Sequence, residues 1–264
     1  MPTSLEVLFA PAEFDALGGR DLTRTVCVVF DVLRATSTIV TALANGAAAV
    51  VPVGEISEAL KMRQRHPSAV LAGERDGVRI QAHLAGGTAF DLGNSPREFE
   101  AGTVRGKTIV MTTTNGTRAL RACSPARSVL LGSFLNLAAT AAFLRQNSPP
   151  ELLLVCGGTL DQAAYEDALG AGALCELLWP ICSPGRIADS ALMARRLFNL
   201  EKKDLLQAFA SSRNGSRLMA QPELRDDVAY CAQCDIFNLV AKMEKDGRVI
   251  AHDGSVETPE ESAS

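Results

Sequence analysis

Several side chains that bind or form anions lie in one short stretch of the chain. The stretch VFDVLRATST (29–38) supplies Asp31, Arg34, Thr36, Ser37 and Thr38. Arginine binds phosphate-like groups through paired hydrogen bonds, and hydroxyls near a helix start cradle them. A carboxylate would repel such an anion unless it holds a cation, and Mg²⁺ bridges carboxylates to phosphate. The stretch therefore raises the question of a shared anion and metal site.

Similar groups occur in four other loops. These loops are GERD (73–76), FDLGNSP (90–96), TTTNGT (112–117) and GGTLDQAAYED (157–167). Ligands of parallel α/β sheets bind beyond the carboxyl ends of the strands, where helix N-termini point. We therefore expect the loops to meet at one edge of a sheet. Together they predict an Mg²⁺-dependent site for a small, anionic, phosphorylated molecule.

Each loop alone also has an ordinary structural interpretation. The hydroxyls of residues 36–38 could cap a helix, and TTTNGT could be a turn. Arg34 could form an ion pair with Asp31. Glu166 and Asp167 are acids that any helix N-terminus favours. The recurrence of such groups at one loop after another is what favours a functional site.

The apolar pattern predicts the fold class. Short runs rich in Val, Ile and Leu are typical of strands buried on both faces. They lie at 5–10, 25–32, 48–53, 69–73, 108–113, 128–132 and 151–156. Helical patterns fall between them, at 36–47, 56–65, 116–123 and 134–146. This alternation predicts a three-layer α/β/α fold with a largely parallel or mixed sheet.

The C-terminal half has a different pattern. The apolar spacing of residues 160–240 predicts mainly helices, and short strands are predicted at 236–240 and 248–252. We expect residues 1–252 to form a single domain, and the polar, acidic segment 253–264 to be disordered. In NSPREFE, Ser95 and Glu98 predict a capping box that starts a helix.

Composition limits the classes of function. The chain has 264 residues and a net charge of −4, with acidic and basic residues interspersed, so no nucleic-acid-binding stripe is indicated. No apolar run reaches the length of a membrane span, and no secretion signal begins the chain, so a cytoplasmic protein is expected.

The pair Cys231 and Cys234 forms a C-x-x-C without nearby histidines, which favours structural cysteines over zinc or redox chemistry.

Several known phosphate motifs are excluded. GTVRGKT (102–108) is one residue too short for a P-loop and leads into a predicted strand. Asp31 ends a strand, as does the acceptor of dehalogenase-type phosphatases, but those need a second Asp where this chain has Leu33. No nucleophile elbow G-x-S-x-G is present.

The same stretches resemble the 2-phosphosulfolactate phosphatase family. The resemblance lies in FDVLRATST, GER, FDLGNSP, TTTNGT, YEDALGAG (165–172) and NGSRLMAQPELRDDVAYCAQCD (214–235), in order along nearly the whole chain. It implies an Mg²⁺-dependent acid phosphatase that hydrolyses (R)-2-phospho-3-sulfolactate to 3-sulfolactate and phosphate, in coenzyme M biosynthesis. It also implies a three-layer α/β/α fold of the family's own type.

The resemblance and the residue types together define the candidate site. The expected catalytic residues are Asp31, Arg34, Glu74 and Asp91. The expected substrate ligands are Arg34, Thr36, Ser37, Arg75, Asn94, Ser95, Thr112, Thr113, Thr114, Asn115 and Gly116. The expected metal ligands are Asp31, Glu74, Glu166, Asp167, Asp227 and Asp235. Asp226 is expected to be solvated surface.

Four alternatives stay open at this point. Asp31 could attack phosphorus directly or could serve a water molecule or the metal. The substrate could be another phosphorylated hydroxy acid. The same site could hold a phosphorylated metabolite without turning it over. The sequence leaves the oligomeric state open, with a homodimer as one alternative.

Overall fold

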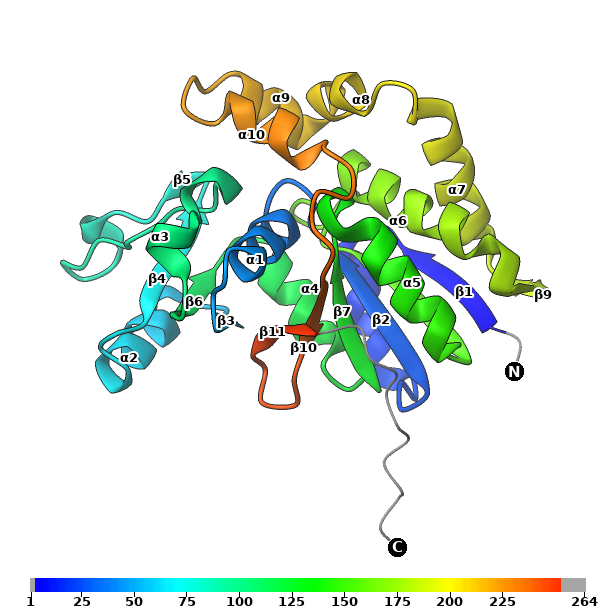
Figure 1. Ribbon diagram of the computed structural model, residues 1–264, viewed down its shortest axis with the longest axis horizontal. Helices are drawn as coiled ribbons and strands as arrows, with labels where there is room; N and C mark the ends of the chain where they lie inside the picture. Colours follow the sequence, from blue (N-terminus) through cyan, green and yellow to red (C-terminus); the bar gives the residue numbers. More distant parts are fainter. Residues whose placement is uncertain (1–2, 253–264) are drawn as a thin grey trace, which may run out of the picture.

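A single mixed sheet forms the centre of the molecule. The structure is a computed structural model that describes residues 3–252. Within that range, eleven strands are hydrogen-bonded in the order β5-β4-β6-β3-β11-β10-β7-β2-β8-β1-β9 (Figure 1). The strands are β1 (Thr3–Leu8), β2 (Thr25–Phe30), β3 (Ala49–Pro52), β4 (Val70–Arg75), β5 (Val78–Arg79), β6 (Thr108–Thr112), β7 (Ser128–Gly132), β8 (Glu151–Cys156), β9 (Cys182–Ile187), β10 (Val240–Met243) and β11 (Val249–His252).

The sheet contains two parallel groups separated by a hairpin. Strands β7, β2, β8, β1 and β9 are parallel, and so are β4, β6 and β3. The hairpin β10–β11 pairs antiparallel with β7 on one side and with β3 on the other. Three successive antiparallel pairings make the two parallel groups run in opposite senses along the sheet. The expected single edge of carboxyl ends is therefore wrong for the sheet as a whole.

Helices cover both faces of the sheet. They are α1 (Ala35–Ala44), α2 (Ile56–Arg65), α3 (Ala101–Val104), α4 (Gly116–Cys123), α5 (Leu137–Asn147), α6 (Tyr165–Leu178), α7 (Asp189–Glu201), α8 (Leu205–Ser211), α9 (Arg213–Met219) and α10 (Arg225–Cys231). A 3₁₀-helix, Pro11–Gly19, packs against α4. The predicted three-layer α/β/α class with a mixed, largely parallel sheet is confirmed.

Strand β2 shows why the sheet needs a helix layer on each face. All six of its residues are buried. Val28 and Phe30 belong to the apolar cluster beneath α5 and α6, while Cys27 and Val29 belong to the cluster beneath α4 and the 3₁₀-helix. Successive side chains of a strand point to opposite faces, so a strand that is apolar throughout requires cover on both.

The predicted strand 248–252 agrees with β11, but the other predicted strand is displaced and one strand was not predicted. Only Val240 of the predicted strand 236–240 is in a strand, because β10 begins there and continues to Met243. The sequence also missed β9, whose CSPGRI contains a Pro and a Gly that are typical of turns. β9 lies at the edge of the sheet, where these residues are tolerated.

The predicted capping box at Ser95 is wrong. Residues Pro96–Glu98 form only one turn of 3₁₀-helix, and the Ser95 side chain does not cap it. The Ser95 hydroxyl instead donates to Asp227 Oδ1 at 2.6 Å. The Glu98 carboxylate accepts from the Gly93 backbone N–H, at 2.9 Å. Both side chains thus fix the loop to its surroundings.

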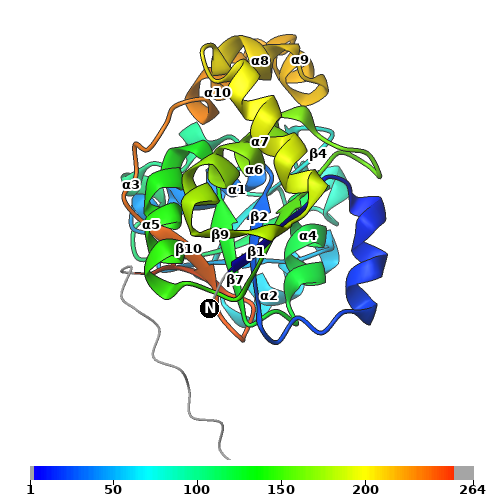
Figure 2. The same cartoon turned by 90° about the vertical axis from the view of Figure 1, so that its right-hand side faces the viewer.

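Helices α8, α9 and α10 gather at one end of the molecule, above α6 and α1 (Figures 1 and 2). The three helices contact each other, and α8 also contacts α6. We call α8–α10 the cap. The predicted disordered tail, 253–264, lies outside the described residues.

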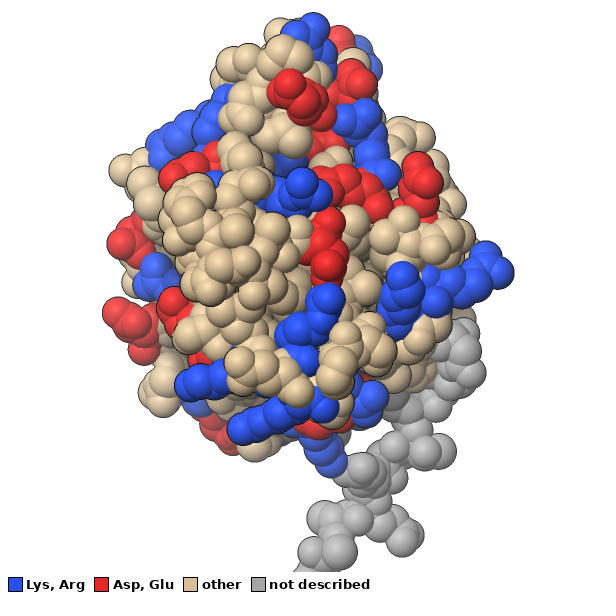
Figure 3. All heavy atoms as spheres, turned by 90° about the vertical axis from the view of Figure 1, so that its left-hand side faces the viewer, with Lys and Arg blue, Asp and Glu red and all other residues tan. Residues whose placement is uncertain are grey.

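The surface agrees with the interspersed charges of the sequence. Acidic and basic side chains alternate over the face shown in Figure 3. None of the helices within residues 3–252 is long and apolar enough to cross a membrane.

A close helix contact gives a test of the packing. A Cβ atom at Gly172 in α6 would lie 2.1 Å from the Ala194 carbonyl oxygen in α7, so Gly172→Ala must push the two helices apart. We expect a loss of about 1–3 kcal/mol in the free energy of unfolding, measured by urea denaturation. Gly102→Ala is the matched control, because nothing lies within 4 Å of a Cβ there. Equal stability of the two variants would contradict the close packing.

Candidate active site

One pocket collects many of the predicted site residues. It has a volume of about 270 Å³. Its lining comprises Asp31, Leu33, Arg34, Glu74, Asp76, Gly77, Asn94, Thr113, Thr114, Asn115, Thr159, Leu160, Arg213, Asn214 and Arg217. These residues come from the loops after β2, β6 and β8, from the end of β4 and the turn after it, from the loop before Pro96, and from α9 in the cap.

Two structural causes bring these loops together. β2 and β8 are parallel neighbours, so Phe30 pairs with Cys156 and the loops that follow begin side by side. β6 belongs to the other parallel group, but α4 follows it directly and packs against β2. The start of α4 therefore lies beside the end of β2. The packing of α4 brings these two segments together, because the strands β6 and β2 do not end at the same edge of the sheet.

Asp31 lies at the centre of this arrangement. Its Oδ1 accepts a hydrogen bond from the Ala35 backbone N–H at 3.1 Å, at the start of α1. No hydrogen bond to Oδ2 is formed by the part of the chain that the structure describes. A Cβ at Gly116 would lie 2.9 Å from Oδ2, and one at Gly157 would lie 3.1 Å from the Asp31 Cβ. The two glycines thus allow two neighbouring loops to approach the carboxyl group closely.

Burial and neighbouring acids change the ionisation of Asp31. Desolvation, together with the nearby charges of Glu74 and Glu166, raises the pKa of its carboxyl group to about 7, against the lowering effects of the Ala35 N–H and Arg34. Burial likewise raises the pKa of Asp167 well above its usual range, with Asp31 and Glu166 adding to the effect. A cation would relieve this concentration of acids.

Arg34 joins the sheet side of the pocket to the cap. Its Nη1 forms a buried ion pair with Asp227 Oδ2 at 2.7 Å, and its Nη2 donates to the Gly77 carbonyl at 2.6 Å. The Asp227 side chain is fully buried and also accepts hydrogen bonds from Ser95 and Arg97. Asp227 thus fixes Arg34 and is fully occupied by protein donors.

Glu74 has a structural task in the pocket wall. Its Oε1 accepts from the Thr114 N–H at 2.8 Å, and its Oε2 accepts from the Gly77 N–H at 2.7 Å. The carboxylate therefore holds the loop after β6 against the turn after β4. Both of its oxygens are engaged with backbone donors.

A second pocket adjoins the first. It has a volume of about 310 Å³ and shares Thr159, Arg213 and Asn214 with the Asp31 pocket. Glu166 lines it, and the Asn214 side-chain amide donates to both Glu166 Oε1 and the Thr159 hydroxyl. Asn214 therefore connects the cap to the acids at the start of α6.

Buried polar atoms without partners mark the two pockets. Within residues 3–252 the unpartnered buried side-chain atoms are Asn94 Oδ1, Thr113 Oγ1, Ser128 Oγ and Glu166 Oε2. Three of the four lie at these two pockets. Buried polar groups normally have hydrogen-bond partners, so these atoms can bond to a ligand without giving up a partner in the protein. The arrangement suits a small polar ligand.

The structure does not bring every predicted residue to the pocket. Asp91 pairs with Arg63 at 2.6 Å and accepts from the Leu71 N–H, and Asp235 accepts from the Ala138 N–H at the start of α5. Others lie behind the wall with their side chains bonded to the protein. These are Thr36, Ser37, Arg75, Ser95, Thr112, Asp167 and Asp227.

The hydroxyls of Thr36, Ser37 and Thr38 have a structural role and do not contact the pocket. The Thr36 hydroxyl donates to the Asp31 carbonyl, and the Ser37 hydroxyl donates to the Val32 carbonyl. Thr38 donates to the Asn94 carbonyl. These bonds fix the backbone around Asp31, so the three hydroxyls support the pocket without lining it.

Sequence reasoning missed the residues that the cap supplies. Arg213, Asn214 and Arg217 line the pocket from α9. Asp76 and Thr159 were also missed, although both are in loops that the sequence singled out. The available signal for α9 was the pair of arginines four residues apart, which places both on one helix face.

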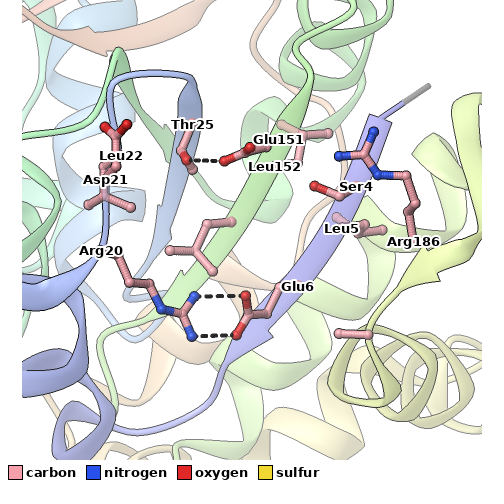
Figure 4. Close-up of a pocket in the computed structure, with 12 residues that line it drawn as sticks. Ser4, Leu5, Glu6, Arg20, Asp21, Leu22, Thr25, Glu151, Leu152 and Arg186 are labelled. Carbon is pink, nitrogen blue, oxygen red and sulfur yellow. Dashed lines mark hydrogen bonds and ion pairs between the residues drawn. The ribbon is translucent and has the colours of Figure 1, made fainter. Parts of the chain in front are cut away.

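Another hollow of about 180 Å³ lies beside β1 and β8 (Figure 4). Its charges satisfy one another: Arg20 forms two hydrogen bonds with Glu6, at 2.8 and 3.0 Å, and Thr25 donates to Glu151. None of the unpartnered buried atoms named above lines it. The Asp31 pocket is therefore the better candidate.

Comparison with known proteins identifies the family. The family model described as 2-phosphosulpholactate phosphatase matches residues 15–246. A protein of Pseudothermotoga lettingae is 37% identical over 243 residues, covering 92% of this chain and 96% of that protein. A protein of Caldanaerobacter subterraneus subsp. tengcongensis is 35% identical over 235 residues, covering 88% and 92%. Both are named "Probable 2-phosphosulfolactate phosphatase".

The matches and the site agree on the class of protein. An α/β sheet with a pocket of carboxylates and arginines, in a chain with these relatives, defines a phosphoric monoester hydrolase. Such an enzyme acts on a small phosphorylated substrate. The chain belongs to the 2-phosphosulfolactate phosphatase family.

The Arg34–Asp227 pair gives a stability test. Asp227→Asn leaves the buried guanidinium without its counter-charge, so we expect a loss of about 3–5 kcal/mol in the free energy of unfolding. Asp226→Asn is the matched control, since that side chain is 67% exposed, and should change stability by less than about 0.5 kcal/mol. Urea denaturation measures both. A small effect at Asp227 would contradict its anchoring role.

The raised pKa of Asp31 gives a pH test. The folded pKa of about 7 exceeds the ordinary value of 3.8, so ionisation of Asp31 destabilises the fold. This penalty is absent below about pH 4 and complete above about pH 7. In EDTA, the melting temperature of the wild type minus that of Asp31→Asn should therefore fall as pH rises through this window. A constant difference would show that Asp31 titrates normally.

Proposed function

We propose that this protein is an Mg²⁺-dependent phosphatase that hydrolyses 2-phospho-3-sulfolactate to 3-sulfolactate and phosphate. The observation that carries the proposal is the Asp31 carboxyl group, buried among further acids beside Arg34, in a member of this family. The printed names of the relatives support the substrate. The resemblance suggests coenzyme M biosynthesis as the route that uses the product.

The donor set fits Mg²⁺. Within residues 3–252 no group of three or more His, Cys, Asp and Glu side chains has the geometry to hold a metal ion. Mg²⁺ in proteins commonly uses one or two carboxylates and completes its shell with water and substrate oxygens. Asp31 and Glu166 would supply these carboxylates, because Asp31 Oδ2 accepts no hydrogen bond from the described residues and Glu166 Oε2 has no partner. When bound, Mg²⁺ would neutralise charge on the phosphoryl group.

The protein's own residues orient the phosphoryl group. Arg34 lines the pocket and is held by Asp227 and Gly77, so its positive charge has a fixed position beside a bound phosphoryl group. The unpartnered Thr113 hydroxyl is a further donor. Asn94 Oδ1, also unpartnered, can accept from water or from the hydroxyl that hydrolysis frees in the product. Positioning and charge stabilisation of this kind supply most of the catalysis in phosphoryl transfer.

Asp31 Oδ2 is our candidate for the reacting oxygen, because no described residue donates a hydrogen bond to it. In the alternative in which Glu166 and not Asp31 holds the metal, this oxygen can attack phosphorus itself or take a proton from an attacking water. Acid-quenched turnover of substrate with a labelled phosphate separates these roles. Only direct attack leaves a label on the protein that hydroxylamine removes.

Phosphate release tests the function. The wild-type protein should release phosphate from 2-phospho-3-sulfolactate, EDTA should abolish the release, and added Mg²⁺ should restore it. Asp31→Asn should lose about 10²–10⁴-fold in kcat, because it removes the reactive carboxylate and keeps its shape. Asp226→Asn, on the exposed surface, should keep wild-type rates.

Two outcomes would contradict the proposal in different ways. Phosphate release that persists in EDTA would contradict the proposed dependence on a metal ion. Absence of release from any phosphorylated hydroxy acid, with retained ligand-induced stabilisation against heat, would indicate a binding protein. Release from another hydroxy-acid phosphate alone would change the substrate and keep the reaction type.

A further inference from the structure

Two arginines of the cap enter the pocket from one face of α9. Arg213 and Arg217 are four residues apart, and both line the Asp31 pocket. The helix begins at a defined point, because the Ser212 hydroxyl accepts from the Gly215 N–H at 3.0 Å. A Cβ at Gly215 would lie 1.8 Å from the Phe209 carbonyl oxygen, so α8 and α9 are closely packed. The two arginines thus come from a well-packed element.

Neither arginine has an acidic partner in the described residues. Arg213 donates to the neutral amide oxygen of Gln162 at 2.6 Å, and no ion pair forms at Arg217 within residues 3–252. Arg34 differs, because Asp227 balances its charge. The pocket also holds Asp31, Glu74 and Asp76, but none of these three described acids forms an ion pair with Arg213 or Arg217. Two like charges at i and i+4 on one helix face repel each other, so both guanidinium groups are available to an anion from outside the chain.

The cap arginine Arg217 and the sheet-side arginine Arg34 both lie close to Gly77. A Cβ at Gly77 would lie 3.8 Å from Arg217 Nη2 and 3.9 Å from Arg34 Nη2. Both guanidinium groups therefore flank the same glycine. An anionic group placed there would be held from the sheet side and from the cap at once.

We propose that Arg213 and Arg217 bind the sulfonate of the substrate and determine the preference for sulfonated phosphate esters. This inference rests on the proposed function. In the proposed function the phosphoryl group lies beside the buried carboxyl group of Asp31 and the unpartnered hydroxyl of Thr113. The cap arginines therefore remain for a second acidic group of the same molecule. A sulfonate stays ionised at all physiological pH values and presents three acceptor oxygens, which two guanidinium groups can share.

The comparison substrate is 2-phospholactate, which keeps the phosphate and the carboxylate but lacks the sulfonate. We expect Arg217→Gln to raise the KM for 2-phospho-3-sulfolactate about tenfold, with a smaller change in kcat. The ratio of kcat/KM for the sulfonated substrate to that for 2-phospholactate should fall by about the same factor. Arg213→Gln should act in the same direction, and the double variant should lose most of the preference.

The control is Arg225→Gln, at the start of α10. This exposed arginine carries the same charge in the cap but does not line the pocket, so both substrates should keep their KM values. Circular dichroism and melting temperatures should show that all variants are folded.

Binding of the product gives a second measurement that does not need turnover. 3-Sulfolactate should raise the melting temperature of the wild type and of Arg225→Gln, and it should not raise that of the double variant. Equal losses for both substrates in Arg217→Gln would overturn the assignment and leave the phosphatase function standing. A wild type that neither hydrolyses 2-phospho-3-sulfolactate nor is stabilised by 3-sulfolactate would overturn both proposals.

Discussion

The buried ion pair between Arg34 and Asp227 is the interaction on which the site depends. It joins the loop after β2 to helix α10, across 193 positions of sequence. Burying two charges is costly, and the cost is offset only when further hydrogen bonds satisfy them. Ser95, Arg97 and the Gly77 carbonyl supply these bonds. The pair therefore fixes, in one network, the sheet, the cap and two loops of the pocket.

Several carboxylates lie close to Asp31, and this group of acids is the second constraint on the site. The individual acids have different roles. Glu74 and Asp167 use their oxygens to hold loop N–H groups, so they shape the pocket. Asp31 and Glu166 each keep an oxygen that no described donor satisfies. An acid that is fully bonded to backbone is a scaffold, whereas an acid with a spare oxygen is available to a ligand. Residue type alone does not separate these cases, but hydrogen-bond accounting does.

The sequence predicted the layers well because burial imposes a pattern on every strand and helix. It located Asp31, Arg34 and the TTTNGT loop at the pocket for the same reason: each follows a recognisable apolar run. It could not separate Asp91 from Glu74, since pairing with Arg63 depends on a contact from α2. It also missed the arginines of α9, because the folding of the cap over the sheet leaves no local pattern.

The β10–β11 hairpin has a consequence for synthesis of the chain. It separates β3 from β7 at the middle of the sheet, yet it consists of residues 240–252, late in the chain. Until the ribosome has released this segment, the edges of β3 and β7 that it will cover have no partner strand. Unpaired edges invite pairing with other chains. The centre of the sheet is therefore complete only when residues 240–252 are in place, and a chain that ends before residue 240 leaves both edges unpaired.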